Sequence, residues 1–304
     1  MAILDDKVAV ISASGQDIGR EIALLMAREG ARVLVNDTDA DNEKKANDPA
    51  TDRQSAQEIE DCPGRTETVT ENVEMWSGGE RLIDAAIDRF GRVDILVNAA
   101  SFLPDKTFHQ MKPKDWDAAL NRQLKGAFIC TRFAADRMRQ QKWGRIIYII
   151  SARALIGSPG QAGAAAANMA VAGLGRNAAI ELKRFNVTSN CIAIFGRLQR
   201  GTAFSAPPGT EDRSPERGEN QSTSGAAPLA VFLAGESAQN ISGQIFGTRG
   251  AEVYLFSQPR PARSLHCSEG WTPESLAAML EPAMKNNFEP LDHATEYLSW
   301  EPMI

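Results

Sequence analysis

The chain has 304 residues, 43% of them hydrophobic, with a formal net charge of -6 and a pI near 5.3. This length allows one large core, so we expect a single domain followed by a tail. No lysine and arginine cluster covers a predicted face, and no apolar run reaches the roughly 18 residues that a bilayer span needs. We therefore expect no nucleic acid and no membrane as partners, and a cytoplasmic location.

The four cysteines lie far apart in the sequence, at positions 62, 130, 191 and 267. They form no C-x-x-C pair and have no histidine partners at metal-ligand spacing, so we expect no metal site. We interpret all four as reduced thiols, with Cys130 and Cys191 buried.

The first 37 residues have the pattern that opens a nucleotide-binding βαβ unit. Residues 7–11 are a β-branched run, residues 20–29 carry apolar side chains at helical spacing, and residues 32–36 predict a second strand closed by Asp37. The turn S-A-S-G-Q-D-I-G at residues 12–19 joins the first strand to the helix.

Strands and helices alternate along the rest of the chain. The predicted elements are helix 80–90, strand 93–97, a long helix or bent pair over 115–138, strand 146–150, an alanine-rich helix over 161–183, strand 187–194, helix 229–233, strand 243–246 and helix 273–284. This alternation predicts an α/β, Rossmann-like doubly wound parallel sheet of about seven strands with helices on both faces.

Two polar segments interrupt this pattern. Residues 39–65 predict a surface excursion with a helix near 55–60, and residues 201–228 predict a mobile lid loop because they carry almost no large apolar side chain. We place the main domain at 1–256 and a C-terminal extension at 257–304, which packs on the same domain or on a partner subunit.

A strand, a loop and a helix meet at Ser151, in the segment I-I-Y-I-I-S-A-R-A-L-I-G-S-P-G that precedes the alanine-rich helix. This segment resembles the catalytic segment of the short-chain dehydrogenase/reductase family, in which a serine ends a strand and a tyrosine thirteen residues on opens a Y-x-x-x-K helix. Further landmarks at the family's intervals are N-A-A-S at 98–101, D-W-D at 115–117, L-K-G-A-F at 124–128 and I-S-G-Q at 241–244. The V-N-D at 35–37, the excursion and the tail are most similar to the (R)-3-hydroxyacyl-CoA dehydrogenase part of peroxisomal multifunctional enzymes.

The resemblance implies NAD(P) at the carboxyl ends of the strands and oligomers built on the long helices. It also exposes departures at the catalytic positions: counting from Ser151, the tyrosine position holds Ala164, the lysine position holds Asn168, and the family's helix asparagine is Gln123. Ala164 has no proton to give and Asn168 carries no charge. We therefore expect Ser151 to be a remnant of a lost redox site.

Neither of two other side chains replaces the missing tyrosine easily. Tyr148 lies three places before Ser151 on an alternating strand, so we expect it to point to the opposite face. His109 is a conceivable acid or base, although a lone loop histidine is more often solvated. The P-G that touches the nicotinamide in the family is Ile194-Phe195 here.

The dinucleotide turn departs as well, because the family's three glycine positions hold Ala13, Asp17 and Gly19. A carboxylate beside a pyrophosphate charge costs roughly 4 kcal/mol at 4 Å and an effective dielectric near 20. Asp17 would alternatively cap its own helix, and in a shifted turn Gly15 would take the role of Ala13. The cofactor-binding candidates are Gly15, Asp17, Ile18, Gly19, Asp37 and Asn98.

These departures predict no cofactor, or NAD if any, because Asp37 would repel a 2′-phosphate. The favoured hypothesis is a catalytically degenerate, non-catalytic subunit that pairs through its long helices with an active relative, or with itself, in hydroxyacyl-CoA oxidation. The alternatives are an NAD-dependent 3-hydroxyacyl-CoA dehydrogenase with a remodelled proton relay, and a cofactor-independent lyase or hydratase. The tail residues Arg260, Arg263 and His266 would meet the phosphates of a CoA thioester, lie over a partner, or form an ordinary solvated arm.

Overall fold

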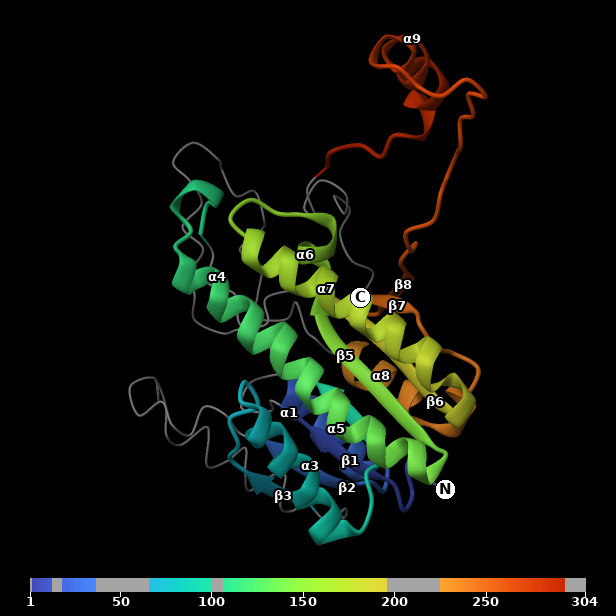
Figure 1. The fold of residues 1–304 in the computed structure, drawn as a ribbon. Helices are drawn as coiled ribbons and strands as arrows, with labels where there is room; N and C mark the ends of the chain where they lie inside the picture. The colour runs from blue at the N-terminus through green and yellow to red at the C-terminus, as the bar shows by residue number, and fades with distance from the viewer. Residues whose placement is uncertain (1, 13–17, 37–65, 100–105, 196–224, 293–304) are drawn as a thin grey trace.

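The computed structural model describes residues 2–12, 18–36, 66–99, 106–195 and 225–292 (Figure 1). The strands are β1 (Val8–Ile11), β2 (Arg32–Asn36), β3 (Thr66–Val69), β4 (Ile95–Asn98), β5 (Gly144–Ser151), β6 (Val187–Ile194), β7 (Ile245–Arg249) and β8 (Glu252–Leu255). The α-helices are α1 (Ile18–Arg28), α3 (Trp76–Phe90), α4 (Pro113–Ala119), α5 (Gly126–Gln141), α6 (Ala152–Ile156), α7 (Ala162–Leu182), α8 (Ala226–Ala234) and α9 (Pro273–Met284). Short 3-10 turns lie at Phe108–Gln110, Lys183–Phe185, Glu236–Ala238 and Lys285–Asn287, and a π-helical segment lies at Leu120–Lys125.

The strands form one sheet in the order β3-β2-β1-β4-β5-β6-β7-β8. All neighbours are parallel except β7 and β8, which are antiparallel, so the predicted doubly wound sheet is confirmed with eight strands in the described residues instead of about seven. The sequence pattern missed β3 because T-E-T-V is an edge strand with no apolar run. It missed β8 because this edge strand is half-exposed and carries little apolar signal; the chain turns back on β7 at Gly250, which has a φ of 58° that favours glycine.

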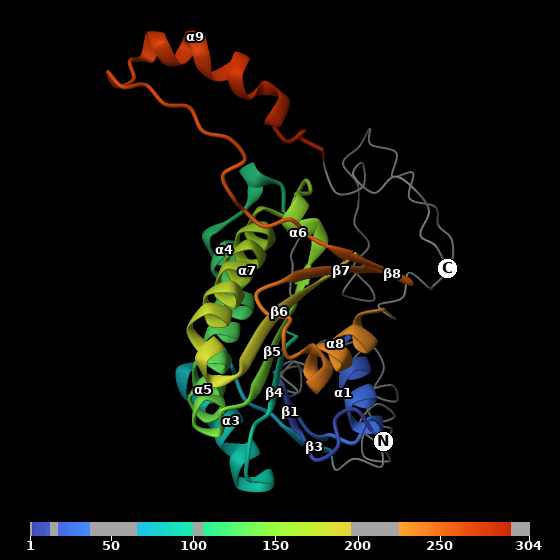
Figure 2. The same cartoon turned by 90° about the vertical axis from the view of Figure 1, so that its right-hand side faces the viewer.

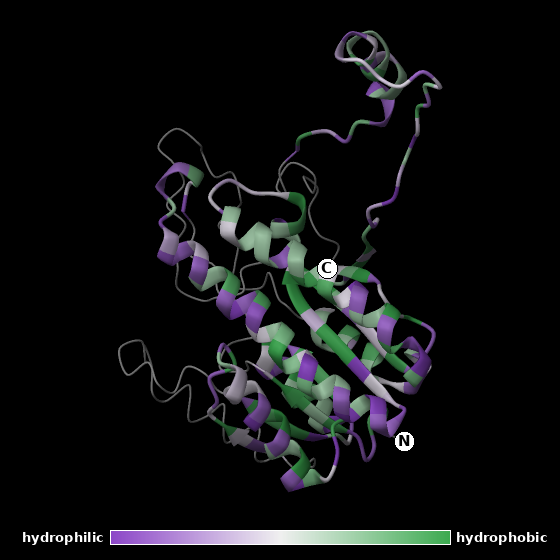
Figure 3. Ribbon diagram, in the orientation of Figure 1, coloured by the Kyte–Doolittle hydropathy of each residue, from purple (hydrophilic) through white to green (hydrophobic). Residues whose placement is uncertain are grey.

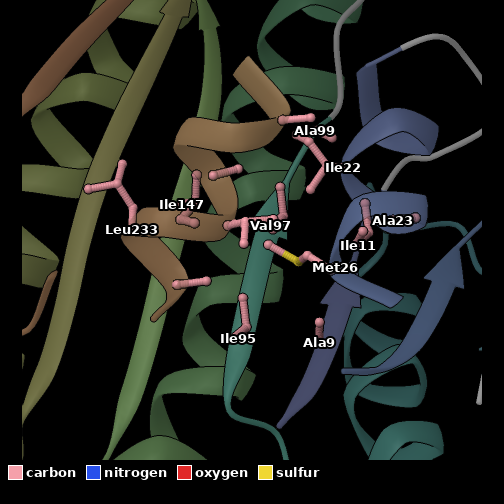
Figure 4. Packing of buried hydrophobic residues seen from close by; sticks show 14 of the residues in the cluster. Ala9, Ile11, Ile22, Ala23, Met26, Ile95, Val97, Ala99, Ile147 and Leu233 are labelled. Atoms are coloured by element: carbon pink, nitrogen blue, oxygen red, sulfur yellow. The ribbon is translucent and has the colours of Figure 1, made fainter. Parts of the chain in front are cut away.

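One face of the sheet is covered by α1 and α8. Ile22 and Met26 of α1 and Leu233 of α8 pack with alternate strand residues such as Val97 and Ile147 (Figure 4). All five side chains are buried. Strand alternation sends every second strand residue, such as Val97 and Ile147, to this face.

The opposite face is covered by α3, α5 and α7, as the turned view shows (Figure 2). Tyr148 and Ile150 of β5 lie in this second cluster, with Cys130 of α5, Val171 of α7 and Cys191 of β6. Burial of both cysteines confirms that expectation, whereas Cys267 is only partly buried and position 62 lies outside the described residues. The central strands β1 and β4 are wholly buried and largely hydrophobic, as a sheet covered on both faces requires (Figure 3).

The predicted long helix or bent pair over 115–138 is a run of three helical segments. It begins at Pro113 in α4, passes through the π-helical segment Leu120–Lys125, and continues as α5. A π-helical insertion rotates the residues before it relative to those after it, and such insertions occur often at functional sites. Here the insertion contains Gln123.

The predicted mobile loop 201–228 ends too late, because Ala226 and Ala227 are already buried in α8. Pro228 fits in α8 because a first-turn residue needs no intrahelical N–H partner. The rest of that loop and the excursion 39–65 fall on residues outside the described ones, so their predictions stay untested.

The C-terminal extension leaves the domain after β8 and carries α9 well away from the sheet (Figures 1 and 2). No residue of α9 is buried, and Thr272 caps its first turn by accepting a hydrogen bond from the Ser275 backbone N–H at 3.2 Å. No helix in the described part of the chain is both long and apolar enough to cross a bilayer.

Candidate functional site

The strand order has its topological switch point between β1 and β4, at the carboxyl edge of the sheet. Chain connections run outward from β1 in one direction through β2 and β3, and from β4 in the other through β5 and β6. Such a switch point is where open α/β sheets bind ligands. Asn98 and Ser151 end β4 and β5 at this edge, as predicted.

Asn168 is the centre of the predicted catalytic positions. It lies on α7, is fully buried, and its Oδ1 accepts hydrogen bonds from the Ser151 backbone N–H at 2.8 Å and from Gln123 Nε2 at 2.9 Å. Its Nδ2 donates to the Ala164 carbonyl one turn earlier at 2.8 Å. The structure therefore brings together all four predicted positions, with the amide of Asn168 as the link.

Gln123 reaches this network from the π-helical segment and is 3% exposed. Its Nε2 is used on Asn168, while its Oε1 has no hydrogen-bond partner among the described residues. The unpaired, buried Oε1 lowers the stability of the fold. The hydrogen bond to Asn168 is the interaction that orients the Gln123 amide.

Ser151 is 4% exposed, and its side chain caps the helix that follows it. It is the N-cap of α6, and its Oγ accepts a hydrogen bond from the Ala154 backbone N–H at 3.4 Å. This is the ordinary role of a serine before a helix. Ala164 is buried at the start of α7 and contributes only its carbonyl.

Tyr148 belongs to a separate buried network on the other face of β5, which confirms the prediction from strand alternation. Its hydroxyl lies 2.8 Å from Thr131 Oγ1, which also accepts a hydrogen bond from Asn98 Nδ2 at 3.2 Å. Burial raises the pKa of Tyr148 above its ordinary value. This phenol is therefore a neutral core group whose hydrogen bonds reach Asn98 through Thr131, and it is separate from the network of Ser151, Gln123 and Asn168.

His109 lies in the 3-10 turn Phe108–Gln110, and its side chain is exposed. It is not one of the residues that hydrogen-bond with Asn168, Gln123 or Ser151. The structure thus gives His109 the position of a solvated loop histidine.

The dinucleotide half of the site is described only in part. Ile18 and Gly19 begin α1 and are buried, while Gly15, Asp17 and Asp37 lie outside the described residues. Asn36, which the sequence analysis did not identify, ends β2 and connects the backbone after β1 with the backbone after β3. Its Nδ2 donates to the carbonyls of Ser12 and Glu71, and its Oδ1 accepts from the Glu71 backbone N–H at 2.8 Å.

Phe195 takes the place of the family's glycine after β6 and has a structural partner. Its ring stacks on Phe256 with a centroid distance of 6.0 Å and meets Tyr254 edge-on at 5.7 Å. Its backbone N–H donates to the Thr248 carbonyl at 3.0 Å. The segment that contacts nicotinamide in the family therefore anchors β8 and the start of the extension here.

The described residues do not fit the nicotinamide half of a dinucleotide. The lysine position is an amide whose oxygen and nitrogen are both used inside the protein, and the tyrosine position has no hydroxyl. In the described residues, no group of three or more His, Cys, Asp or Glu side chains could hold a metal ion. Sequence reasoning missed Thr131 and Phe256, because only packing brings them to Tyr148 and Phe195.

Residues 7–196 match the family model described as short chain dehydrogenase. The chain is 32% identical over 239 residues to peroxisomal multifunctional enzyme type 2 of Mus musculus, an alignment that covers 79% of this chain and 31% of that protein. It therefore spans about a third of the multifunctional enzyme. A subunit of (2S)-[(R)-hydroxy(phenyl)methyl]succinyl-CoA dehydrogenase from Thauera aromatica is 34% identical over 190 residues, covering 62% of this chain and 73% of the subunit.

Among solved structures, the crystal structure of a short chain dehydrogenase from Mycobacterium avium superposes with a TM-score of 0.80 at 28% identity. That match covers 93% of this chain and 96% of the other. The shared fold extends well beyond the residues that the family model matches.

Proposed function

The chain belongs to the short-chain dehydrogenase family, and we propose that it is a subunit without redox activity of its own, paired with an active relative that oxidises hydroxyacyl-CoA-like substrates. One observation carries this proposal: the amide of Asn168 is committed on both sides to Ser151, Gln123 and Ala164. The residue at the lysine position is therefore a fully buried, uncharged amide that bonds within the protein and presents no ammonium group to a bound ligand.

The hydrogen bonds around Asn168 support a structural role in place of a catalytic one. In an active member of the family the lysine ammonium lowers the pKa of the tyrosine and binds the nicotinamide ribose. Without both groups, hydride transfer would leave the substrate hydroxyl proton with no acceptor. The exposed position of His109 offers no replacement, so the alternative of a remodelled proton relay gains no support from the described residues.

The names of the relatives support the substrate class and the assembly. The mouse relative is a peroxisomal multifunctional enzyme, and the Thauera relative is named a subunit of a dehydrogenase for a hydroxy-substituted succinyl-CoA. A cytoplasmic location stays a prediction, since relatives include peroxisomal proteins.

The outer face of α7 is the surface that we assign to the partner. Met169, Gly173, Asn177 and Ile180 form an exposed stripe along it, with Met169 49% and Ile180 65% exposed. A Cβ built on Gly173 would meet no atom within 4 Å, so the helix backbone is open to close approach there. Large apolar side chains beside an open backbone are typical of a helix that packs against another helix.

Titration with NAD, followed by turnover assays with a panel of 3-hydroxyacyl-CoA thioesters, tests the loss of activity. We expect no saturable heat of NAD binding at micromolar concentrations and no NADH formation from any thioester. The intact relative from the same source serves as the positive control. A micromolar dissociation constant together with turnover would contradict the proposal.

Co-expression with an intact dehydrogenase encoded nearby tests the assembly. We expect the two chains to elute together on gel filtration, and Gly173→Glu to separate them by placing a charge on the α7 stripe. Ser237→Glu, at an exposed position in the 3-10 turn after α8, is the matched control and should leave the complex intact. Separate elution of the two wild-type chains would count against the paired subunit.

A further inference from the structure

A second cavity lies far from the catalytic positions, at the amino ends of β6 and β7. It has a volume of about 590 Å³ and is bounded by the second half of α7, the loop before β7 and the chain that leaves β8. In the β5–β6 register, Val187 pairs with Gly144 and Ile194 pairs with Ser151. Seven residues of strand therefore separate this cavity from the catalytic edge, or about 23 Å.

The charges on the wall of this cavity are all positive. Arg176, Lys183 and Arg260 line it, and none of the lining residues is acidic. None of the three forms an ion pair with a carboxylate among the described residues. In a chain with a net charge of -6, such a wall concentrates anions.

The rest of the lining suits a ligand that also carries polar and flat groups. Side-chain amides of Asn186, Gln239 and Asn240 supply hydrogen-bond donors, and Phe256 and Ile180 supply apolar surface. A volume of this size lies in the range of pockets that bind small molecules. The chemistry on the wall matches a phosphate ester with a ring attached.

We propose that this cavity binds a phosphate-bearing small molecule of nucleotide size. Arg176 and Arg260 would hold the phosphate oxygens in the bidentate geometry that guanidinium groups favour, with Lys183 adding a third charge. Arg260 is free to turn toward the ligand, because its side chain is exposed and donates only to the carbonyl of its neighbour Pro259.

The cavity is built by the start of the C-terminal extension. The Gln258 side chain is hydrogen-bonded to Arg176 of α7 and to the Gly243 carbonyl, and the Phe256 backbone N–H donates to the Ile245 carbonyl at 2.9 Å. A ligand that contacts Arg260 therefore also holds the segment that leads to α9. We expect ligand binding to reduce hydrogen exchange in residues 256–272.

Calorimetry with ADP as the probe and adenosine as the uncharged comparison tests the site. We expect saturable binding of ADP only, weakened about tenfold, or ~1.4 kcal/mol, by Arg260→Ala and by Lys183→Gln. Arg263→Ala, an exposed tail residue that does not line the cavity, is the matched control and should stay within twofold.

The dinucleotide crevice is the competing location for ADP, and Asp37→Ala reports on it. Loss of binding in Asp37→Ala but not in Arg260→Ala would overturn the proposal, as would an absence of saturable ADP binding. Unchanged hydrogen exchange in residues 256–272 with ADP bound would overturn the role of the extension as a wall of the site. Since the cavity is remote from Asn168, none of these results depends on whether the chain has redox activity.

Discussion

Gln123 Nε2 donates to Asn168 Oδ1 at 2.9 Å, so the side chain at the family's asparagine position is bonded directly to the side chain at its lysine position. Both residues are buried, and the π-helical segment before α5 brings them together across the α7 interface. In active members of the family these two positions belong to the proton relay. Here their side chains form a hydrogen bond between the π-helical segment and α7.

Asn168→Ala should destabilise the fold by ~2–4 kcal/mol. The change leaves the Ser151 backbone N–H and Gln123 Nε2 without their acceptor in a buried site, and each such loss costs about 1–3 kcal/mol before relaxation. Urea denaturation measures the free energy of unfolding. Asn177→Ala on the same helix is the matched control, because that side chain is exposed and bonds only Glu181, and it should stay within ~0.5 kcal/mol. Equal costs for the two variants would contradict a structural role for Asn168.

Gln123→Leu should cost much less, within ~1 kcal/mol. It removes one hydrogen bond but also removes Oε1, a buried acceptor with no partner among the described residues, while Asn168 Oδ1 keeps the Ser151 N–H. The same denaturation experiment gives the value. A loss as large as that of Asn168→Ala would contradict this account, in which Gln123 contributes one hydrogen bond to the network.

Alkaline pH should unfold the protein through its buried neutral groups. Burial raises the pKa of Cys130 and of Cys191 to about 12, from an ordinary value of 9.0, and it raises the pKa of Tyr148 as well. A group whose pKa is higher in the folded state than in the unfolded state stabilises the folded state. Its full contribution is present at pH values below its pKa in the unfolded chain. That stability is lost as pH rises from about 9 towards 12.

The measurement is the free energy of unfolding at a series of pH values from 7 to 10.5. We expect a decline above pH 9 that becomes shallower in the variant Tyr148→Phe with Cys191→Ala, because fewer buried groups then bind an extra proton in the folded state. An identical slope in the variant and the wild type would show that other groups cause the decline. Alkylation of the native protein should correspondingly modify Cys267 and spare both buried thiols.

Phe195→Ala should release the start of the C-terminal extension. The ring stacks on Phe256 and contacts Tyr254, so its removal leaves a cavity between β6, β8 and the tail, at a cost of ~3 kcal/mol. Limited proteolysis should cut the variant faster after residue 256. Phe288→Ala is the matched control because Phe288 is 55% exposed, and it should be cut at the wild-type rate. Equal rates for both variants would contradict an anchoring role.

The sequence alone determined the alternation of elements, the doubly wound sheet and the identity of the catalytic positions. The alternation and the sheet follow from the apolar periodicity of each segment, whereas the catalytic positions follow from the resemblance to short-chain dehydrogenases, counted from Ser151. The orientation of Tyr148 followed from strand periodicity, since alternate strand residues face opposite sides. The edge strands β3 and β8 were missed, because half-exposed strands carry little apolar signal.

Only the tertiary structure decided what the replaced positions do. No pattern in the sequence shows that the Asn168 amide spans Gln123, Ser151 and Ala164, since these residues come from different elements and meet through packing. The same holds for Phe195 on Phe256, and for Arg176 and Arg260 across one cavity. Spacing along a chain fixes which residues share a face of one element, but contacts between elements depend on how complete side chains fill the space between them.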